Sequence, residues 1–144
     1  MNHAGRLEAH VMAYCDKHHL IPRFEMSDIV EINSLRQRKR GVAWPHGDDA
    51  GCYAMFGKEK ELLYIGLARH LAGRLNNWFR YDERENASLP WTSSTIGAWK
   101  TQPKFIQTIR VNQPYEAPSL EAFLIGVLAP RENITLRNVS EFSN

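Results

Sequence analysis

Two tripeptides, each with one tyrosine, stand a fixed distance apart in this sequence. Gly51-Cys52-Tyr53 is followed, after ten intervening residues, by Tyr64-Ile65-Gly66, and Arg74 lies eight residues beyond Gly66. Tyrosine hydroxyls can reach a phosphate or its attacking water, and a guanidinium presents paired N–H groups to phosphate oxygens. These residue types suit the binding and cleavage of a phosphodiester.

Glu121 is the carboxylate that completes this set. Its close neighbours in the sequence are apolar: Leu120, Phe123, Leu124 and Ile125. Burying a carboxylate in such surroundings is costly unless it is paired or binds a cation. A hard divalent ion such as Mg²⁺ accepts one carboxylate together with waters and phosphate oxygens. The alternative is a solvated residue in the first turn of a helix, where the helix dipole favours negative charge.

The ordered series, with Pro130 and Asn133 nine and twelve residues after Glu121, resembles the GIY-YIG nuclease superfamily. It looks most like the short version in the N-terminal incision domain of excision-repair endonucleases, in homing endonucleases and in some restriction enzymes. The resemblance implies a metal-dependent endonuclease that hydrolyses phosphodiester bonds of nucleic acid, with DNA favoured over RNA.

The same resemblance implies a role for each site residue. A Mg²⁺ or Mn²⁺ ion would bind Glu121, Arg74 would contact the scissile phosphate, and a tyrosine would deprotonate or position water. Asn133 would position the site. The implied catalytic residues are Tyr53, Tyr64, Arg74, Glu121 and Asn133.

Three positions depart from the pattern of that superfamily. Many members carry Tyr or His one helical turn after the arginine, where this chain has Trp78, which cannot transfer a proton. Many carry Lys directly after the second glycine, where this chain has Leu67; the first motif has Cys52 where Ile or Val is usual. His70 and Tyr81 are possible substitutes in a proton relay. Two alternatives stay open: a catalytically impaired nucleic-acid-binding module on the same scaffold, with Trp78 and Leu67 marking lost chemistry, and a protein-interaction or regulatory domain in which the N-terminal extension docks a partner.

Contacts with nucleic acid are expected from basic and aromatic side chains. The run 36–40 is either a phosphate contact or a solvated helix end, where cations suit the helix dipole. A net charge of +2, from 18 basic and 16 acidic residues, does not by itself indicate nucleic acid. The candidate contacts are Arg36, Arg38, Lys39, Arg40, Arg69, His70 and Trp78.

The elements that must position these residues follow from the apolar pattern. We expect strands at Cys52–Phe56 and Leu62–Ile65, a helix with Leu67, Leu71, Leu75 and Trp78 on one stripe, a strand at Phe105–Val111 and a helix at Ser119–Leu128. Residues 82–103 receive no assignment. The order predicts an α+β domain over 49–144, with a small three-stranded antiparallel or mixed sheet flanked by helices.

The hairpin register decides whether the two tyrosines meet. A loop with an even number of residues, either Lys58-Glu59 or Gly57 to Lys60, pairs positions whose numbers sum to 117, which places Tyr53 opposite Tyr64. A loop with an odd number would place them on opposite faces of the sheet.

Residues 1–48 are expected to form an N-terminal helical extension. Arg6–His19 and Met26–Lys39 show helical spacing, with Ser27 as the candidate N-cap of the second helix. The two cysteines, Cys15 and Cys52, are expected to be reduced thiols of a cytoplasmic protein. No stretch reaches the ~18 apolar residues that a membrane span requires, so we expect no membrane partner. The sequence leaves the oligomeric state open.

Overall fold

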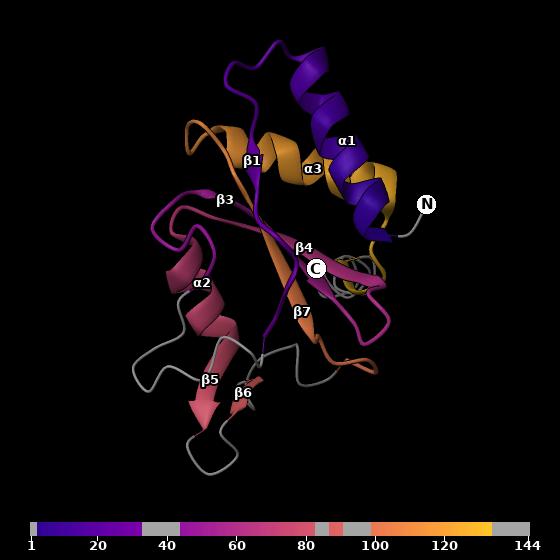
Figure 1. The fold of residues 1–144 in the computed structure, drawn as a ribbon, viewed down its shortest axis with the longest axis vertical. Coiled ribbons are helices and arrows are strands. Elements are labelled where there is room, and N and C mark those ends of the chain that lie inside the picture. Colours follow the sequence, from indigo (N-terminus) through magenta and orange to yellow (C-terminus); the bar gives the residue numbers. More distant parts are fainter. Residues whose placement is uncertain (1–2, 33–43, 83–86, 91–98, 134–144) are drawn as a thin grey trace, which may run out of the picture.

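The computed structural model describes residues 3–32, 44–82, 87–90 and 99–133 (Figure 1). The helices in this part of the chain are α1 His3–Lys17, α2 Leu71–Trp78 and α3 Glu116–Leu128. The strands are β1 Glu25–Met26, β2 Val30–Glu31, β3 Gly51–Phe56, β4 Leu62–Ala68, β5 Phe79–Asp82, β6 Ala87–Pro90 and β7 Phe105–Arg110. The predicted α+β class is confirmed. None of these helices is long and apolar enough to cross a membrane.

The main sheet is antiparallel and larger than the three strands expected. Its order is β1-β7-β3-β4. β1 and β2 both pair with β7, β1 near the C-terminal end of β7 and β2 near its N-terminal end. β3 lies in the middle, between β7 and β4, and β4 forms one edge. β5 and β6 form a separate two-stranded sheet; β6 lies within the stretch 82–103 that received no assignment from sequence, and β5 ends where that stretch begins.

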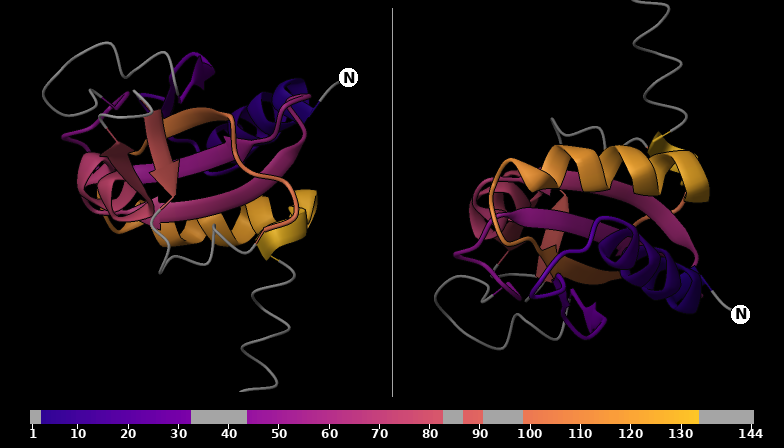
Figure 2. Two further views of the ribbon diagram at one scale, coloured as in Figure 1. Left: turned by 90° about the horizontal axis from the view of Figure 1, so that it is seen from below. Right: turned by 90° about the horizontal axis from the view of Figure 1, so that it is seen from above.

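Helices cover both faces of the main sheet. Figure 2 shows α1 and α3 on one face, with α2 and the β5–β6 hairpin on the other. Side chains alternate along β3 accordingly: Cys52, Ala54 and Phe56 pack under α1 and α3, while Tyr53 and Met55 pack under α2. Because both faces are covered, every residue of β3 is buried.

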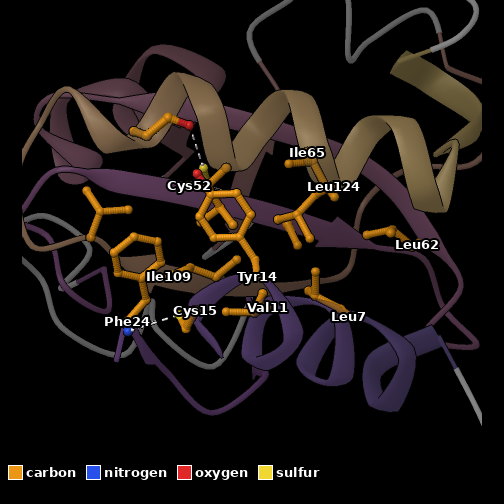
Figure 3. Close-up of a cluster of buried hydrophobic side chains, with 14 of the residues drawn as sticks. Leu7, Val11, Tyr14, Cys15, Phe24, Cys52, Leu62, Ile65, Ile109 and Leu124 are labelled. Atoms are coloured by element: carbon orange, nitrogen blue, oxygen red, sulfur yellow. Dashed lines mark hydrogen bonds between the residues drawn. The ribbon is translucent and has the colours of Figure 1, made fainter. Parts of the chain in front are cut away.

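The core between α1, α3 and the sheet joins residues from both ends of the chain (Figure 3). Leu7 and Val11 on α1 and Leu124 on α3 are fully buried against Ile65 and Ile109 of the sheet. The Tyr14 and Ser119 hydroxyls are hydrogen-bonded at 2.6 Å, which ties α1 to α3. This core fixes α3, and with it Glu121, against β3 and β4.

The predicted helix over Met26–Lys39 is wrong for residues 26–32. Two short strands run there instead, with Met26 paired to Ile109 and Val30 paired to Ile106. Ser27 caps no helix, because its hydroxyl donates to the Asp28 carbonyl and accepts from the Thr108 amide. The first predicted helix is confirmed as α1. The N-terminal segment therefore adds two strands to the main sheet and one helix that packs on it. Residues 33–43 lie outside the described part.

The predicted hairpin register is wrong by two residues. Tyr53 pairs with Gly66, and Met55 pairs with Tyr64, so partner numbers sum to 119. The loop between Phe56 and Leu62 has an odd number of residues, and the register shifts between Met55 and Phe56. This bulge adds one residue on β4 and restores the alternation. Tyr53 and Tyr64 therefore lie on the same face, as diagonal rather than direct neighbours.

Helix α2 starts at Leu71, with His70 as its N-cap. The Leu71 and Ala72 amides donate to the carbonyls of Asp49 and Gly47, and the Gly73 amide donates to His70 Nδ1. Leu67, expected on this helix, belongs to β4. The loop before β3 thus fixes the start of the helix that carries Arg74.

Candidate active site

The two tyrosines of the paired tripeptides meet on the α2 face of the sheet. Their ring centroids are 6.1 Å apart, with the planes at 42°. Tyr53 is fully buried on the central strand, whereas Tyr64 on the edge strand is half-buried. Trp99 packs on the Tyr64 ring with centroids 5.5 Å apart. Packing therefore fixes Tyr53, whereas Tyr64 reaches the surface.

The two glycines of the motifs are required by close approach of other groups. A Cβ on Gly66 would overlap Cζ and Oη of Tyr53, whose ring lies across that glycine. A Cβ on Gly51 would overlap the carbonyl oxygen of Ile109 on β7. The first glycine therefore permits strand pairing, and the second leaves room for the Tyr53 phenol to reach the edge of the sheet.

Side chains of helix α2 contact the Tyr53 hydroxyl. Trp78 Nε1 donates a hydrogen bond of 2.7 Å to this oxygen, and the nearby Arg74 guanidinium lowers the pKa of the same phenol. The Arg74 guanidinium carbon lies 5.3 Å from the Trp78 ring centroid, one helical turn away. Trp78 thus contacts both the phenol and the guanidinium. An indole N–H can only donate, so Tyr53 keeps its own O–H available for another partner.

A cleft of about 520 Å³ opens at the edge of β4 and contains four of the five predicted catalytic residues. Tyr53, Tyr64 and Arg74 line it from the α2 face of the sheet, and Glu121 lines it from α3 on the other face. The remaining lining residues are Leu67, Ala68, Arg69, His70, Gly73 and Asn77. The cleft therefore brings a guanidinium, two phenols and a carboxylate to one place across the edge strand.

Burial shifts the titration of the phenols and of the carboxyl in this cleft. It raises the pKa of Tyr53, while the hydrogen bonds from Trp78 and Arg74 oppose that rise. It also raises the pKa of Tyr64, with a further rise from Tyr53. The pKa of Glu121 is raised by burial and lowered by Arg74. Both phenols consequently keep their protons at neutral pH.

Glu121 lies in the second turn of α3, since that helix begins at Glu116. It is half-buried, so the alternative of a fully solvated first-turn residue does not describe its surroundings. Its charge interacts with Arg74, Tyr53 and Tyr64. Glu121 therefore belongs electrostatically to the same cluster as the residues on the opposite face of the sheet.

Asn133 lies outside the lining of the cleft and contacts the backbone of β4. Its Oδ1 accepts from the Ile65 amide at 2.7 Å, and its Nδ2 donates to the Ile65 carbonyl at 2.9 Å. Ile65 is the residue between Tyr64 and Gly66, on the strand that forms the sheet edge. The Asn133 side chain therefore pairs with the open edge of β4 as another strand would.

The other candidate contacts fall into two groups. Arg69, His70 and Trp78 lie at or beside the cleft, with Arg69 and His70 exposed. Four basic residues lie outside the described part of the chain: Arg36, Arg38, Lys39 and Arg40. The Tyr81 side chain is likewise not described. Sequence reasoning missed Asn77, whose signal is its position three residues after Arg74 on the same helix.

The residues of the cleft fit a divalent cation that takes few protein ligands. Within residues 3–32, 44–82, 87–90 and 99–133, no three His, Cys, Asp or Glu side chains form a metal-binding group. Glu121 is a half-buried carboxylate beside an open cleft. Mg²⁺ is commonly bound through one or two carboxylates, with waters and substrate phosphate oxygens as its other ligands. Glu121, the one carboxylate among the described residues that line the cleft, is the residue that would hold such an ion.

Comparison with known proteins adds an independent finding. Residues 49–134 match the UvrC-like GIY-YIG domain family. The UvrABC system protein C of Helicobacter acinonychis (strain Sheeba) is 37% identical over 113 residues, which cover 78% of this chain and 17% of that protein. The protein of the same name from Helicobacter pylori (strain J99) is 37% identical over 89 residues, 62% of this chain and 15% of the relative. That of Borrelia duttonii (strain Ly) is 33% identical over 89 residues, 62% of this chain and 13% of the relative. The match thus spans less than a fifth of each relative.

Proposed function

The chain belongs to the UvrC-like GIY-YIG domain family, as its motifs predict, and from this premise we propose that it is a divalent-metal-dependent endonuclease acting on DNA. The observation that carries the proposal is the shared cleft of Tyr53, Tyr64, Arg74 and Glu121. These side chains come from two strands and two helices, on both faces of the sheet. A cluster made only for stability would not require an open cleft beside an arginine and a half-buried carboxylate.

The proposed reaction is hydrolysis of a phosphodiester. The oxygen of water bonds to phosphorus, one ester P–O bond breaks, and the products are a phosphate monoester and a free hydroxyl. Negative charge accumulates on the non-bridging oxygens in the transition state, so donors positioned there lower the barrier. Arg74 is the donor we assign to these oxygens, because it lines the cleft and presents a planar fork of N–H groups.

The tyrosines are assigned to positioning rather than to proton abstraction. Burial raises the pKa of both phenols, so neither is a ready base at neutral pH. A protonated phenol can still donate a hydrogen bond to a phosphate oxygen or to the attacking water. The Tyr53 oxygen accepts from Trp78, an interaction that leaves the Tyr53 O–H as a donor for this purpose.

Glu121 is assigned to hold the divalent cation, Mg²⁺ or Mn²⁺. A cation bound there supplies Lewis-acid stabilisation of charge on the phosphate and on the leaving oxygen. Asn133 is assigned as a positioning residue that acts through the Ile65 backbone, because its side chain contacts β4 and not the cleft.

A second candidate function is supported by Trp78 and Leu67. These residues stand where many family members have a proton-transferring side chain and a lysine, and Leu67 lines the cleft. A domain with these changes would bind nucleic acid through Arg69 and Arg74 without cutting it. Such binding would weaken steeply with salt, because each phosphate contact releases counterions.

Supercoiled plasmid DNA separates the two functions. The purified chain is incubated with the plasmid in Mg²⁺, in Mn²⁺ and in EDTA, and products are resolved as nicked or linear forms. We expect metal-dependent nicking, and less cutting of RNA of matched length. Retarded but intact plasmid under every metal would favour the binding module. Neither binding nor cutting at low salt would favour the protein-interaction alternative.

A further inference from the structure

His70 stands at the junction between the cleft and the start of α2. Its Nδ1 accepts a hydrogen bond of 3.0 Å from the Gly73 amide, so the ring serves as the N-cap of the helix. The ring lies beside the cleft with 57% of its side chain exposed. One edge of the imidazole is therefore committed to the backbone, and the other edge is open to the solvent of the cleft.

The capping bond decides which nitrogen carries the hydrogen. An amide N–H can donate to Nδ1 only when that nitrogen has no hydrogen, so the ring hydrogen must be on Nε2. In this tautomer Nε2 is a fixed N–H donor directed away from the helix. Oδ1 of Asp48 lies 3.6 Å away, within ion-pair range of a protonated ring, and the Asp48 side chain is fully exposed. This distance is too long for a hydrogen bond, so no hydrogen bond to another described residue occupies Nε2–H.

Two arginines near His70 favour an anionic partner, whereas the exposed Asp48 carboxylate beside Nε2 opposes one. Arg69 precedes it in the chain and Arg74 follows one helical turn later, and both line the same cleft. The amides at the start of α2 are satisfied by Asp49, Gly47 and His70 itself. The backbone of the helix terminus therefore offers no free N–H group to a ligand, so an anion at this end of the cleft would be bound by side chains, the His70 imidazole and the Arg69 guanidinium among them.

We propose that His70 Nε2–H donates a hydrogen bond to a backbone phosphate of the bound nucleic acid while the same ring caps α2. This inference rests on the proposed function for the substrate class. It assigns to one residue two separable roles, one toward the substrate and one toward the helix that carries Arg74. Since the donor is uncharged in this tautomer, its contact adds affinity without releasing a counterion.

Two substitutions separate these roles. His70→Asn keeps a side-chain acceptor for the Gly73 amide, because Asn is among the best N-caps, but it lacks a donor at the position of Nε2. His70→Ala removes both the cap and the donor. Arg69→Gln is the matched control, since it removes a charged group beside the same cleft and leaves the cap intact.

The experiment measures the affinity of the full chain for a fluorescent DNA duplex in EDTA, at several salt concentrations, together with the thermal unfolding midpoint. His70→Asn should weaken binding about 10- to 150-fold, the usual effect of losing a hydrogen bond to a charged group. It should leave the unfolding midpoint and the salt slope unchanged. His70→Ala should weaken binding similarly and also lower the midpoint by several degrees, roughly what the loss of an N-cap costs. Arg69→Gln should weaken binding and reduce the salt slope by about one contact.

Binding by His70→Asn equal to that of the wild type would overturn the proposal, and so would a salt slope reduced as in Arg69→Gln. An unfolding midpoint of His70→Asn as low as that of His70→Ala would overturn the capping role. Wild-type binding that is sensitive to His70→Asn, without any cutting in Mg²⁺ or Mn²⁺, would refute the endonuclease and leave the His70 contact standing. Absence of wild-type binding to the duplex would refute both.

Discussion

The Tyr53 phenol lies across the backbone of Gly66 on the neighbouring strand, in the space where any other residue would have a Cβ. This contact joins the two tripeptide motifs physically. It also explains how a fully buried tyrosine on the central strand lines a cleft at the edge of the sheet. Gly66 of the second motif therefore leaves the space that the Tyr53 side chain of the first motif occupies.

Gly66→Ala tests this relationship. The added methyl would displace the Tyr53 ring and its bond with Trp78, at a cost of about 1–3 kcal/mol in the free energy of unfolding. We expect cleavage to fall at least about 100-fold, because misplacement of a catalytic group by about 1 Å has effects of that size. Gly126→Ala is the control, since nothing lies within 4 Å of its Cβ position on α3. Full activity in Gly66→Ala would show that the position of Tyr53 is unimportant.

Trp78→Phe removes the donor to Tyr53 and keeps an aromatic ring beside Arg74. Loss of one partly buried hydrogen bond should lower the free energy of unfolding by about 1 kcal/mol. We expect single-turnover cleavage to slow about tenfold, because the Tyr53 oxygen loses its fixed position.

Trp44→Phe provides the comparison for that variant. It removes a similar hydrogen bond, from Trp44 Nε1 to Asn76 at 2.8 Å, which lies outside the cleft lining. Its unfolding free energy should fall by a similar amount while cleavage is unchanged. Equal cleavage rates for both variants would show that the Trp78 hydrogen bond to Tyr53 does not contribute to cleavage.

Asn133→Ala removes both side-chain hydrogen bonds to the Ile65 backbone. The open edge of β4 would lose its partner, so we expect faster hydrogen exchange at the Ile65 amide and a loss of about 1–3 kcal/mol in the free energy of unfolding. Cleavage should fall through the altered position of Tyr64 and Gly66. Asn112→Ala, which removes an exposed bond to the Pro22 carbonyl, should leave the Ile65 amide protected. An unchanged exchange rate at Ile65 in Asn133→Ala would contradict the positioning role.

Glu121 should make stability depend on pH. Its pKa is raised in the folded chain by burial, with partial opposition from Arg74. A carboxyl with a raised folded pKa stabilises the fold while protonated, below its unfolded pKa of about 4.3, and loses this contribution as pH rises through the folded pKa. Glu121→Gln removes the ionisation. Urea unfolding should therefore find the variant more stable than the wild type at neutral pH, with the difference vanishing near pH 4. A variant less stable than the wild type at neutral pH would reverse the sign and contradict the burial argument.

The motif series and the strand periodicity predicted the side-by-side tyrosines but not their register. The prediction that Tyr53 and Tyr64 share one face assumed a loop with an even number of residues; the loop has an odd number, and the bulge returns the two rings to one face. The pairing depends on the turn and on a bulge near Phe56, where Lys60 adopts a positive φ of 61°. No apolar pattern reveals a single inserted residue, so the register of the hairpin followed only from the structure.

The N-terminal segment was misjudged because its strands are held by distant partners. Ile29, Val30 and Ile32 fit a helical stripe, yet Val30 pairs with Ile106 and the Ile32 amide donates to the Lys104 carbonyl. Strands of two residues carry no periodicity of their own. The resemblance implied that Asn133 positions the site, but the partner of its side chain was not predictable, since Ile65 lies 68 positions away.

The most direct test of the account is the single-turnover rate of DNA cleavage in Mg²⁺ for three proteins: the wild type, Glu121→Gln and Glu116→Gln. Both variants lose one carboxylate from α3, but Glu116 lies at the helix start, where it accepts from the Gln113 amide, and does not line the cleft. The account predicts that Glu121→Gln cuts at least about 1,000-fold more slowly, as expected when a group that acts directly on the transition state is lost. Glu116→Gln should cut within about threefold of the wild type. Cleavage by Glu121→Gln at the wild-type rate would contradict the proposal that this cleft is the catalytic centre.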